Sequence, residues 1–125
     1  MGLLSGLLGN ASEFSPEKAT KEYGELLAPG EQIEYAFKII RDAMLFTTHR
    51  LVMVNKQGMT GKKVAYHSVP YKSISHFSIE TSGHFDLDAE LKIWISSNDV
   101  PIEKRFSKDA NIYDVQKVLV SYLTR

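Results

Sequence analysis

The fold is decided by residues 44–79, which read MLFTTHRLVMVNKQGMTGKKVAYHSVPYKSISHFSI. This segment contains short apolar runs typical of β-strands, a turn bounded by Gly58 and Gly61, and a break at Pro70. It contains no recognisable set of catalytic residues. The combination predicts an antiparallel β fold that acts as a platform and not as an enzyme.

Further strands are predicted on both sides of this segment. Inward and outward positions alternate over residues 33–39, which predicts a strand with one buried side and one solvent-facing side that carries Glu34, Ala36 and Lys38. Residues 51–55 begin with a continuous apolar run, which instead predicts a strand that is covered on both faces. Short links favour antiparallel neighbours, and seven such strands favour a bent sandwich or an open barrel. The other predicted strands cover residues 43–47, 64–69, 74–81, 85–95 and 102–106.

Two helices are predicted outside the strands. Ser15 can cap a helix that begins at Pro16, and this helix is expected to continue until Pro29 and Gly30 stop it. Residues 112–123 carry one apolar stripe at helical spacing, so they predict a C-terminal helix that plugs an open end of the barrel. We therefore divide the chain into a helical extension, residues 1–30, and a main β domain, residues 31–125.

Composition excludes several classes of function. The chain has 125 residues, which suits a single domain, and its 15 basic residues balance its 15 acidic residues. A chain with this balance has no net positive electrostatic potential to attract nucleic acid, so no nucleic-acid partner is expected. The absence of cysteine excludes disulfides, thiol catalysis and thiolate metal sites. The apolar N-terminus lacks a preceding basic residue and is too short to span a bilayer, which predicts a cytoplasmic protein.

Four segments of the chain form one recognisable pattern: DAMLFTTHRL at 42–51, NKQG at 55–58 followed by GKK at 61–63, SVPYKSI at 68–74, and TSGHFDLDAEL at 81–91. Together they resemble the bacterial pleckstrin-homology domain family. The resemblance extends from about Glu31 to the C-terminus and implies a seven-stranded barrel of two orthogonal sheets with a C-terminal helix. It also implies self-assembly into ring-like homo-oligomers, and it implies neither an enzymatic activity nor a cofactor.

Candidate ligand and metal sites in this sequence have simpler structural interpretations. Lys38 and Arg41 lie near the first hairpin but are followed by Asp42, so the basic cluster that grips several phosphates is absent. Residues 58–63 look like a phosphate-binding loop, but they lack its first glycine and its final Ser or Thr, so a hairpin tip is expected. The four histidines lack zinc-motif spacing, although those at positions 67 and 76 would meet if their strands were neighbours. No catalytic, cofactor-binding or metal-binding residue is therefore predicted, and a small hydrolase is the least favoured function.

Five apolar residues are the candidate interface. Trp94 interrupts a row of polar residues on its strand, and an aromatic residue in such a position indicates either a contact surface or a covering helix. The N-terminal leucines can pack on the body of the protein, enter a subunit interface or lie on a membrane surface. They have no nearby Lys or Arg, so packing or assembly is favoured over a membrane. The expected partner is a second copy, and the alternative is a membrane-surface or peptide-binding adaptor that uses these leucines or residues 56–63. The candidate residues are Leu3, Leu4, Leu7, Leu8 and Trp94.

Overall fold

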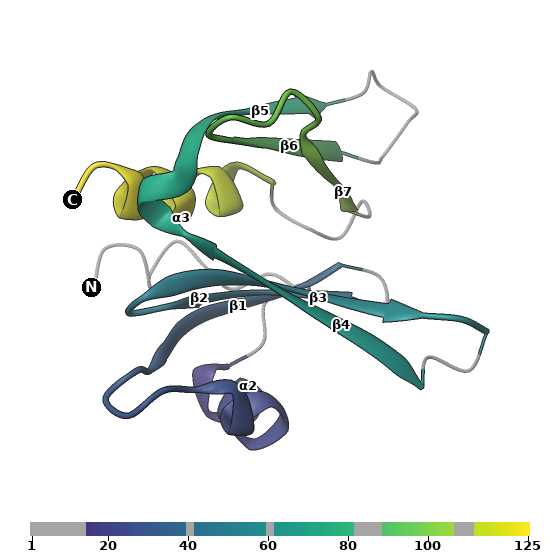
Figure 1. The fold of residues 1–125 in the computed structure, drawn as a ribbon, viewed down its shortest axis with the longest axis vertical. Coiled ribbons are helices and arrows are strands. Elements are labelled where there is room, and N and C mark those ends of the chain that lie inside the picture. Colours follow the sequence, from purple (N-terminus) through teal and green to yellow (C-terminus); the bar gives the residue numbers. More distant parts are fainter. Residues whose placement is uncertain (1–14, 40–41, 60–61, 82–88, 107–111) are drawn as a thin grey trace. The chain divides into compact units, whose positions relative to one another are not determined.

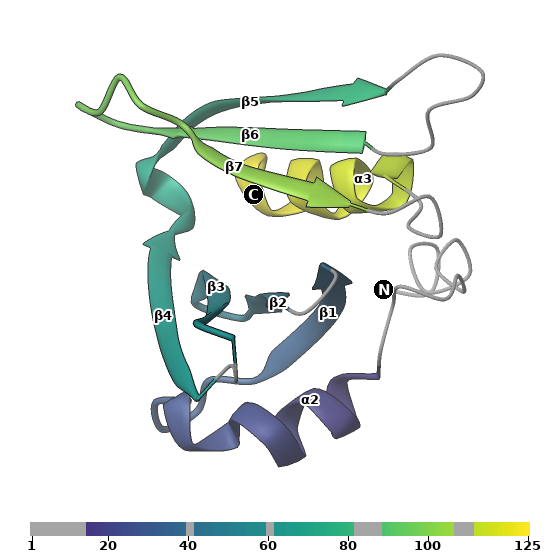
Figure 2. The same cartoon turned by 90° about the vertical axis from the view of Figure 1, so that its right-hand side faces the viewer.

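A computed structural model describes residues 15–39, 42–59, 62–81, 89–106 and 112–125 (Figures 1 and 2). The chain divides into two compact units. The described residues of one unit lie within residues 15–70, and those of the other lie within residues 71–125. Each unit contains one antiparallel sheet and one α-helix among the described residues.

The first unit is a four-stranded meander in which each strand pairs with the next one along the chain. All of its pairs are antiparallel, as the short links predict, and the sheet order is β1-β2-β3-β4. The predicted strands are confirmed to within a residue or two at their ends. The elements are α2 Pro16–Tyr23, the 3₁₀ turn η1 Gly24–Leu26, β1 Ile33–Ile39, β2 Asp42–Thr47, β3 Arg50–Gln57 and β4 Lys63–Pro70.

Helix α2 begins as the sequence predicts. The Ser15 side chain accepts a hydrogen bond from the Lys18 backbone N–H at 3.1 Å, and Pro16 occupies the first turn. The predicted end of the helix is wrong, because the α-helix stops at Tyr23 and a 3₁₀ turn follows it. Gly24 accounts for this, since glycine has low helix propensity and helices commonly tighten into 3₁₀ geometry at their ends.

Helix α2 lies along one face of this sheet in both views (Figures 1 and 2). Tyr23 and the fully buried Ala19 join the buried apolar residues of that face, which include Ala36. The prediction that Ala36 faces solvent is therefore wrong, because α2 covers its side of β1. The opposite face is also apolar and buried, and the rings of Phe37 and Phe46 meet there edge to face at 6.0 Å. Burial of β3 on both faces is confirmed.

The second unit is a three-stranded antiparallel sheet with the C-terminal helix along one face (Figure 2). The helix has the predicted bounds, and its apolar stripe is buried, as Val115 and Leu119 show. The described part of the predicted strand 85–95 begins at Ala89, and residues 85–88 lie outside the described residues. The elements are η2 Tyr71–Ser73, β5 Ile74–Thr81, β6 Ala89–Ile95, β7 Ile102–Phe106 and α3 Ile112–Leu123.

The two units together confirm the predicted fold class. Among the described residues, seven antiparallel strands form sheets of four and three, with α2 before the strands and α3 after them. Strand order within each sheet follows the chain, so no crossover connection is needed.

Candidate functional site

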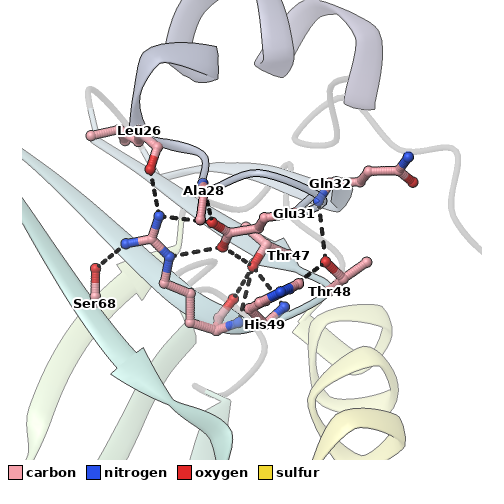
Figure 3. Close-up of polar contacts among 9 residues, drawn as sticks. Leu26, Ala28, Glu31, Gln32, Thr47, Thr48, His49 and Ser68 are labelled. Carbon is pink, nitrogen blue, oxygen red and sulfur yellow. Dashed lines mark hydrogen bonds and ion pairs between the residues drawn. The ribbon is translucent and has the colours of Figure 1, made fainter.

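The described residues contain a polar cluster centred on a buried ion pair between Glu31 and Arg50 (Figure 3). Glu31 precedes β1, and Arg50 is the first residue of β3. The two side chains form a bidentate pair, with Arg50 Nε 2.8 Å from Oε2 and Arg50 Nη2 3.0 Å from Oε1. The Glu31 side chain is 1% exposed, so this carboxylate is almost completely removed from water.

Two further donors complete the shell around the Glu31 carboxylate. The hydroxyl of Thr47 donates to Oε2 at 2.6 Å, and the backbone N–H of Ala28 donates to Oε1 at 2.9 Å. Thr47 Oγ1 also accepts hydrogen bonds from the backbone N–H groups of His49 and Arg50. The turn between β2 and β3 is therefore fixed by the same threonine that holds the carboxylate.

The remaining donors of Arg50 reach two other segments. Its Nη1 donates to Ser68 Oγ on β4 at 2.6 Å, and its Nη2 donates to the carbonyl oxygen of Leu26 at 2.6 Å. One guanidinium thus connects the end of η1, the start of β1 and the edge strand β4. The planar five-donor geometry of arginine suits this task, and a lysine ammonium could not reproduce it.

The electrostatics of the pair indicate a structural role. Hydrogen bonding to Arg50 lowers the pKa of Glu31 from 4.5 to about 2, against the opposing effect of burial. The same interaction raises the pKa of Arg50. At neutral pH both groups are fully charged and hydrogen-bonded, so Glu31 is a poor proton acceptor for acid–base chemistry. The cluster ties the end of η1, the start of β1 and the strands β3 and β4 together.

The three described histidines lie in different turns and strands. His49 lies in the turn between β2 and β3, where its Nδ1 is 2.7 Å from Thr48 Oγ1. His67 lies on β4 of the first sheet and His76 on β5 of the second sheet, so their strands are not paired neighbours. His84 lies outside the described residues. Within the described part of the chain, no three His, Asp or Glu side chains are placed to hold a metal ion.

Trp94 lies where the sequence predicts, on a polar face of the second sheet. It is in register with His76 on β5, and the two rings stack with centroids 4.5 Å apart and planes 21° apart. The next position on this face of β6 is Lys92, whose Nζ lies 3.7 Å from Glu80 and 3.8 Å from Glu90. Trp94 is half-buried and His76 is exposed. The other candidate interface residues, Leu3, Leu4, Leu7 and Leu8, lie outside the described residues.

The hairpin between β3 and β4 carries the most exposed apolar side chain among the described residues. Met59 at its tip is 101% exposed, and Gly58 adopts a φ of +77°, a conformation that glycine accommodates without strain. Lys62 and Lys63 beside the tip are exposed. At the neighbouring first hairpin, Asp42 Oδ1 accepts the backbone N–H of Lys56 at 2.8 Å. The described part of this segment joins β3 to β4, a strand–loop–strand setting, whereas residues 60 and 61 of the predicted hairpin tip lie outside the described residues.

Sequence reasoning missed the Glu31–Arg50 cluster. Thr47 and Arg50 lie within the segment that carries the family resemblance, but their partner Glu31 precedes them by 16 and 19 residues. The one feature of the sequence that could have indicated the cluster is an acidic residue, Glu31, just before the predicted strand at residues 33–39. That signal is too common to indicate an ion pair.

Comparison with known proteins identifies the protein family of the chain. The model of the bacterial pleckstrin-homology domain family matches residues 2–123. The chain belongs to the bacterial pleckstrin-homology domain family. This family assignment confirms the resemblance seen in the sequence, and the match extends through the N-terminal helix as well as the strands.

Individual family members support the assignment over the whole chain. The Bacillus subtilis (strain 168) protein YjqA is 55% identical over 122 residues, which cover 97% of this chain and 98% of YjqA. The crystal structure of a pleckstrin-homology domain from Shewanella amazonensis SB2B is 45% identical, with a TM-score of 0.82 and coverage of 98% of each chain. A protein with this domain from Shewanella loihica PV-4 is also 45% identical, with a TM-score of 0.78 and coverage of 93% of this chain and 99% of its own.

Membrane crossing by a helix finds no support in the described residues. None of their helices combines the length and the apolar character that a bilayer span requires.

Proposed function

We propose that this protein is a non-catalytic, cytoplasmic scaffold module that self-assembles into ring-like homo-oligomers. In this proposal residues 31–125 form the pleckstrin-homology part and residues 1–30 form its helical extension. The observation that carries self-assembly is the polar face of the second sheet, where half-buried Trp94 stacks on exposed His76. Tryptophan is enriched at the energetic centres of protein interfaces, and the ring arrangement rests on the family resemblance.

Light scattering across micromolar concentrations tests self-assembly. We expect a mass several times that of the 14.1 kDa chain, and a shift toward monomer in Trp94→Ala. Tyr113→Ala is the matched control, because Tyr113 is 56% exposed on α3 and its loss removes an aromatic side chain elsewhere. A wild-type protein that is strictly monomeric over this range contradicts the proposal.

The contribution of the N-terminal leucines is tested separately. Deletion of residues 1–14 removes Leu3, Leu4, Leu7 and Leu8 but leaves the capping residue of α2 in place. If the leucines belong to the interface, this deletion lowers the assembled mass as Trp94→Ala does. An unchanged mass assigns the interface to the folded units alone.

A second candidate function is that of an adaptor for a membrane surface or a peptide. The observation that favours it is the tip of the hairpin between β3 and β4, where fully exposed Met59 lies beside exposed Lys62 and Lys63. An apolar side chain flanked by cations suits an anionic surface. Flotation with vesicles of phosphatidylcholine and phosphatidylserine tests the membrane version. That version is wrong if the protein does not float either with or without residues 1–14.

A further inference from the structure

The edges of the two sheets differ in how they are protected against pairing with another strand. An unprotected edge presents a row of backbone N–H and C=O groups, and proteins usually block it with charges, bulges or short strands. Edge strand β1 has a register irregularity and exposed Lys38, and edge strand β5 has a register irregularity and exposed Glu80. Edge strand β7 is five residues long and carries consecutive charges at residues 103–105.

Edge strand β4 has none of these protections along its middle. It is eight residues long and pairs with β3 in an unbroken register from Arg50↔Pro70 to Gln57↔Lys63. The residues between Lys63 and Pro70 carry no Asp, Glu, Lys or Arg. Among the described strands, none pairs with the side of β4 that faces away from β3, which we call the outer edge of β4.

Pro70 determines which backbone groups lie along this outer edge. Proline has no N–H, so Pro70 cannot exchange a pair of hydrogen bonds with Arg50, and the Arg50 N–H is donated to Thr47 Oγ1 at 2.9 Å. Arg50 and Pro70 are therefore a non-hydrogen-bonded pair. Because the two kinds of pair alternate along an antiparallel ladder, the odd-numbered residues of β4 bond to β3. The outward N–H and C=O groups belong to Val64, Tyr66 and Ser68.

The surroundings of the outer edge select the chemistry of its occupant. Lys62 and Lys63 are exposed where β4 begins, so an acidic end of an incoming strand would be favoured there. Tyr66 is 47% exposed at the centre of the strand, and its ring meets Tyr23 of α2 edge to face at 6.5 Å. This aromatic pair offers an apolar contact to a side chain of the added strand.

We propose that the outer edge of β4 binds an extended peptide segment of a partner protein. The segment adds a fifth strand to the first sheet, bonds to the backbone of Val64, Tyr66 and Ser68, and places Asp or Glu residues beside Lys62 and Lys63. Backbone bonding supplies the affinity, while the lysines and Tyr66 supply direction and selectivity. This site gives the adaptor function a peptide-binding surface, and it does not require self-assembly.

A phage library of random dodecapeptides, selected on the full-length protein, provides the probe. We expect enriched peptides with alternating apolar residues and acidic residues toward one end. The affinity of one enriched peptide is then measured by fluorescence anisotropy on three test variants and one control variant. Tyr66→Ala removes the aromatic side chain and keeps the backbone N–H. Tyr66→Pro also removes the outward N–H, so it should bind the peptide at least about tenfold more weakly than Tyr66→Ala does.

The third variant tests the charges. Lys62→Glu/Lys63→Glu should weaken binding about tenfold or more, whereas the matched control Lys18→Glu/Lys117→Glu makes the same charge change at exposed positions elsewhere and should bind like the wild type. Hydrogen exchange on the wild type provides a measurement that does not depend on any variant. Bound peptide should protect the amides of Val64, Tyr66 and Ser68, while the amide of Ala65, already bonded to β3, should change little.

Three results would overturn this assignment. They are a selection that yields no enriched peptide, a peptide that binds Tyr66→Pro as tightly as Tyr66→Ala, and protection that appears away from β4. A further outcome is that the wild type forms an oligomer, that added peptide leaves this oligomer intact, and that Tyr66→Pro is monomeric. In that case the edge belongs to a second copy and the peptide assignment is wrong. The mass of the wild-type protein separately decides whether self-assembly occurs, so the two proposals fail independently.

Discussion

Replacing Glu31 with glutamine should destabilise the protein by about 3 kcal/mol at pH 7. The substitution keeps the shape of the side chain but removes the charge that faces Arg50 at 2.8 Å. The pKa of Glu31 is about 2 instead of 4.5, and each pH unit between these values is worth about 1.4 kcal/mol. The carboxylate is 1% exposed, so solvent screens this interaction little.

The difference in the free energy of unfolding between the wild type and Glu31→Gln should depend on pH, and this dependence is a stricter test than the size of the difference at pH 7. Because the pKa of Glu31 is lowered in the folded state, its stabilising effect is fully present above about pH 5 and is lost as the pH falls toward 2. The free energy of unfolding of Glu31→Gln should therefore approach that of the wild type on acidification. We expect the difference to fall to about 1.4 kcal/mol at pH 3.

Urea denaturation followed by circular dichroism at pH 7, 5, 4 and 3 measures these differences. Glu25→Gln is the matched control, because Glu25 is exposed in the neighbouring 3₁₀ turn and its substitution should change stability by less than about 0.5 kcal/mol. The reasoning is refuted if Glu31→Gln and the wild type agree within about 0.5 kcal/mol at pH 7. A difference that stays constant from pH 7 to pH 3 would also refute it.

Three further substitutions test other parts of the structure. Phe46→Ala removes a fully buried ring and should cost about 3–5 kcal/mol in urea denaturation, and a cost below about 1 kcal/mol would show that this ring is not in the core. Ser15→Ala removes the cap of α2 and should cost about 1 kcal/mol in the same assay, whereas no loss would contradict the capping bond. His76→Ala uncovers Trp94, the one tryptophan of the chain, and should shift its fluorescence emission to longer wavelength, and an unchanged spectrum would argue against the stack.

Most of the fold could be predicted because its signals are local. The Ser15-Pro16 start of α2, the bounds of α3 and all seven strands follow from caps, periodicity and turn residues within a few positions of each element. The prediction was wrong where an element met a distant one. Ala36 looks solvent-facing in an alternating strand, but α2 covers it, and covering by a separate helix leaves no trace in the alternation.

The polar cluster was unpredictable for a related reason. Glu31, Thr47 and Arg50 are ordinary residue types for loops and strand ends, and their bonding depends on the register of three strands. Trp94 was located correctly because its strand alternates clearly, yet its stacking partner His76 required the register between β5 and β6. Periodicity predicts which face a residue occupies, whereas pairing between segments determines what it contacts.

The shared guanidinium of Arg50 also has a consequence for sequence variation among relatives. Loss of Arg50 alone would leave a buried carboxylate without its counter-charge, and loss of Glu31 alone would leave a guanidinium that is 24% exposed without its main acceptor. Each single change is therefore costly, while joint replacement by apolar residues is tolerable. Positions 31 and 50 should consequently covary, with homologues keeping both charges or neither.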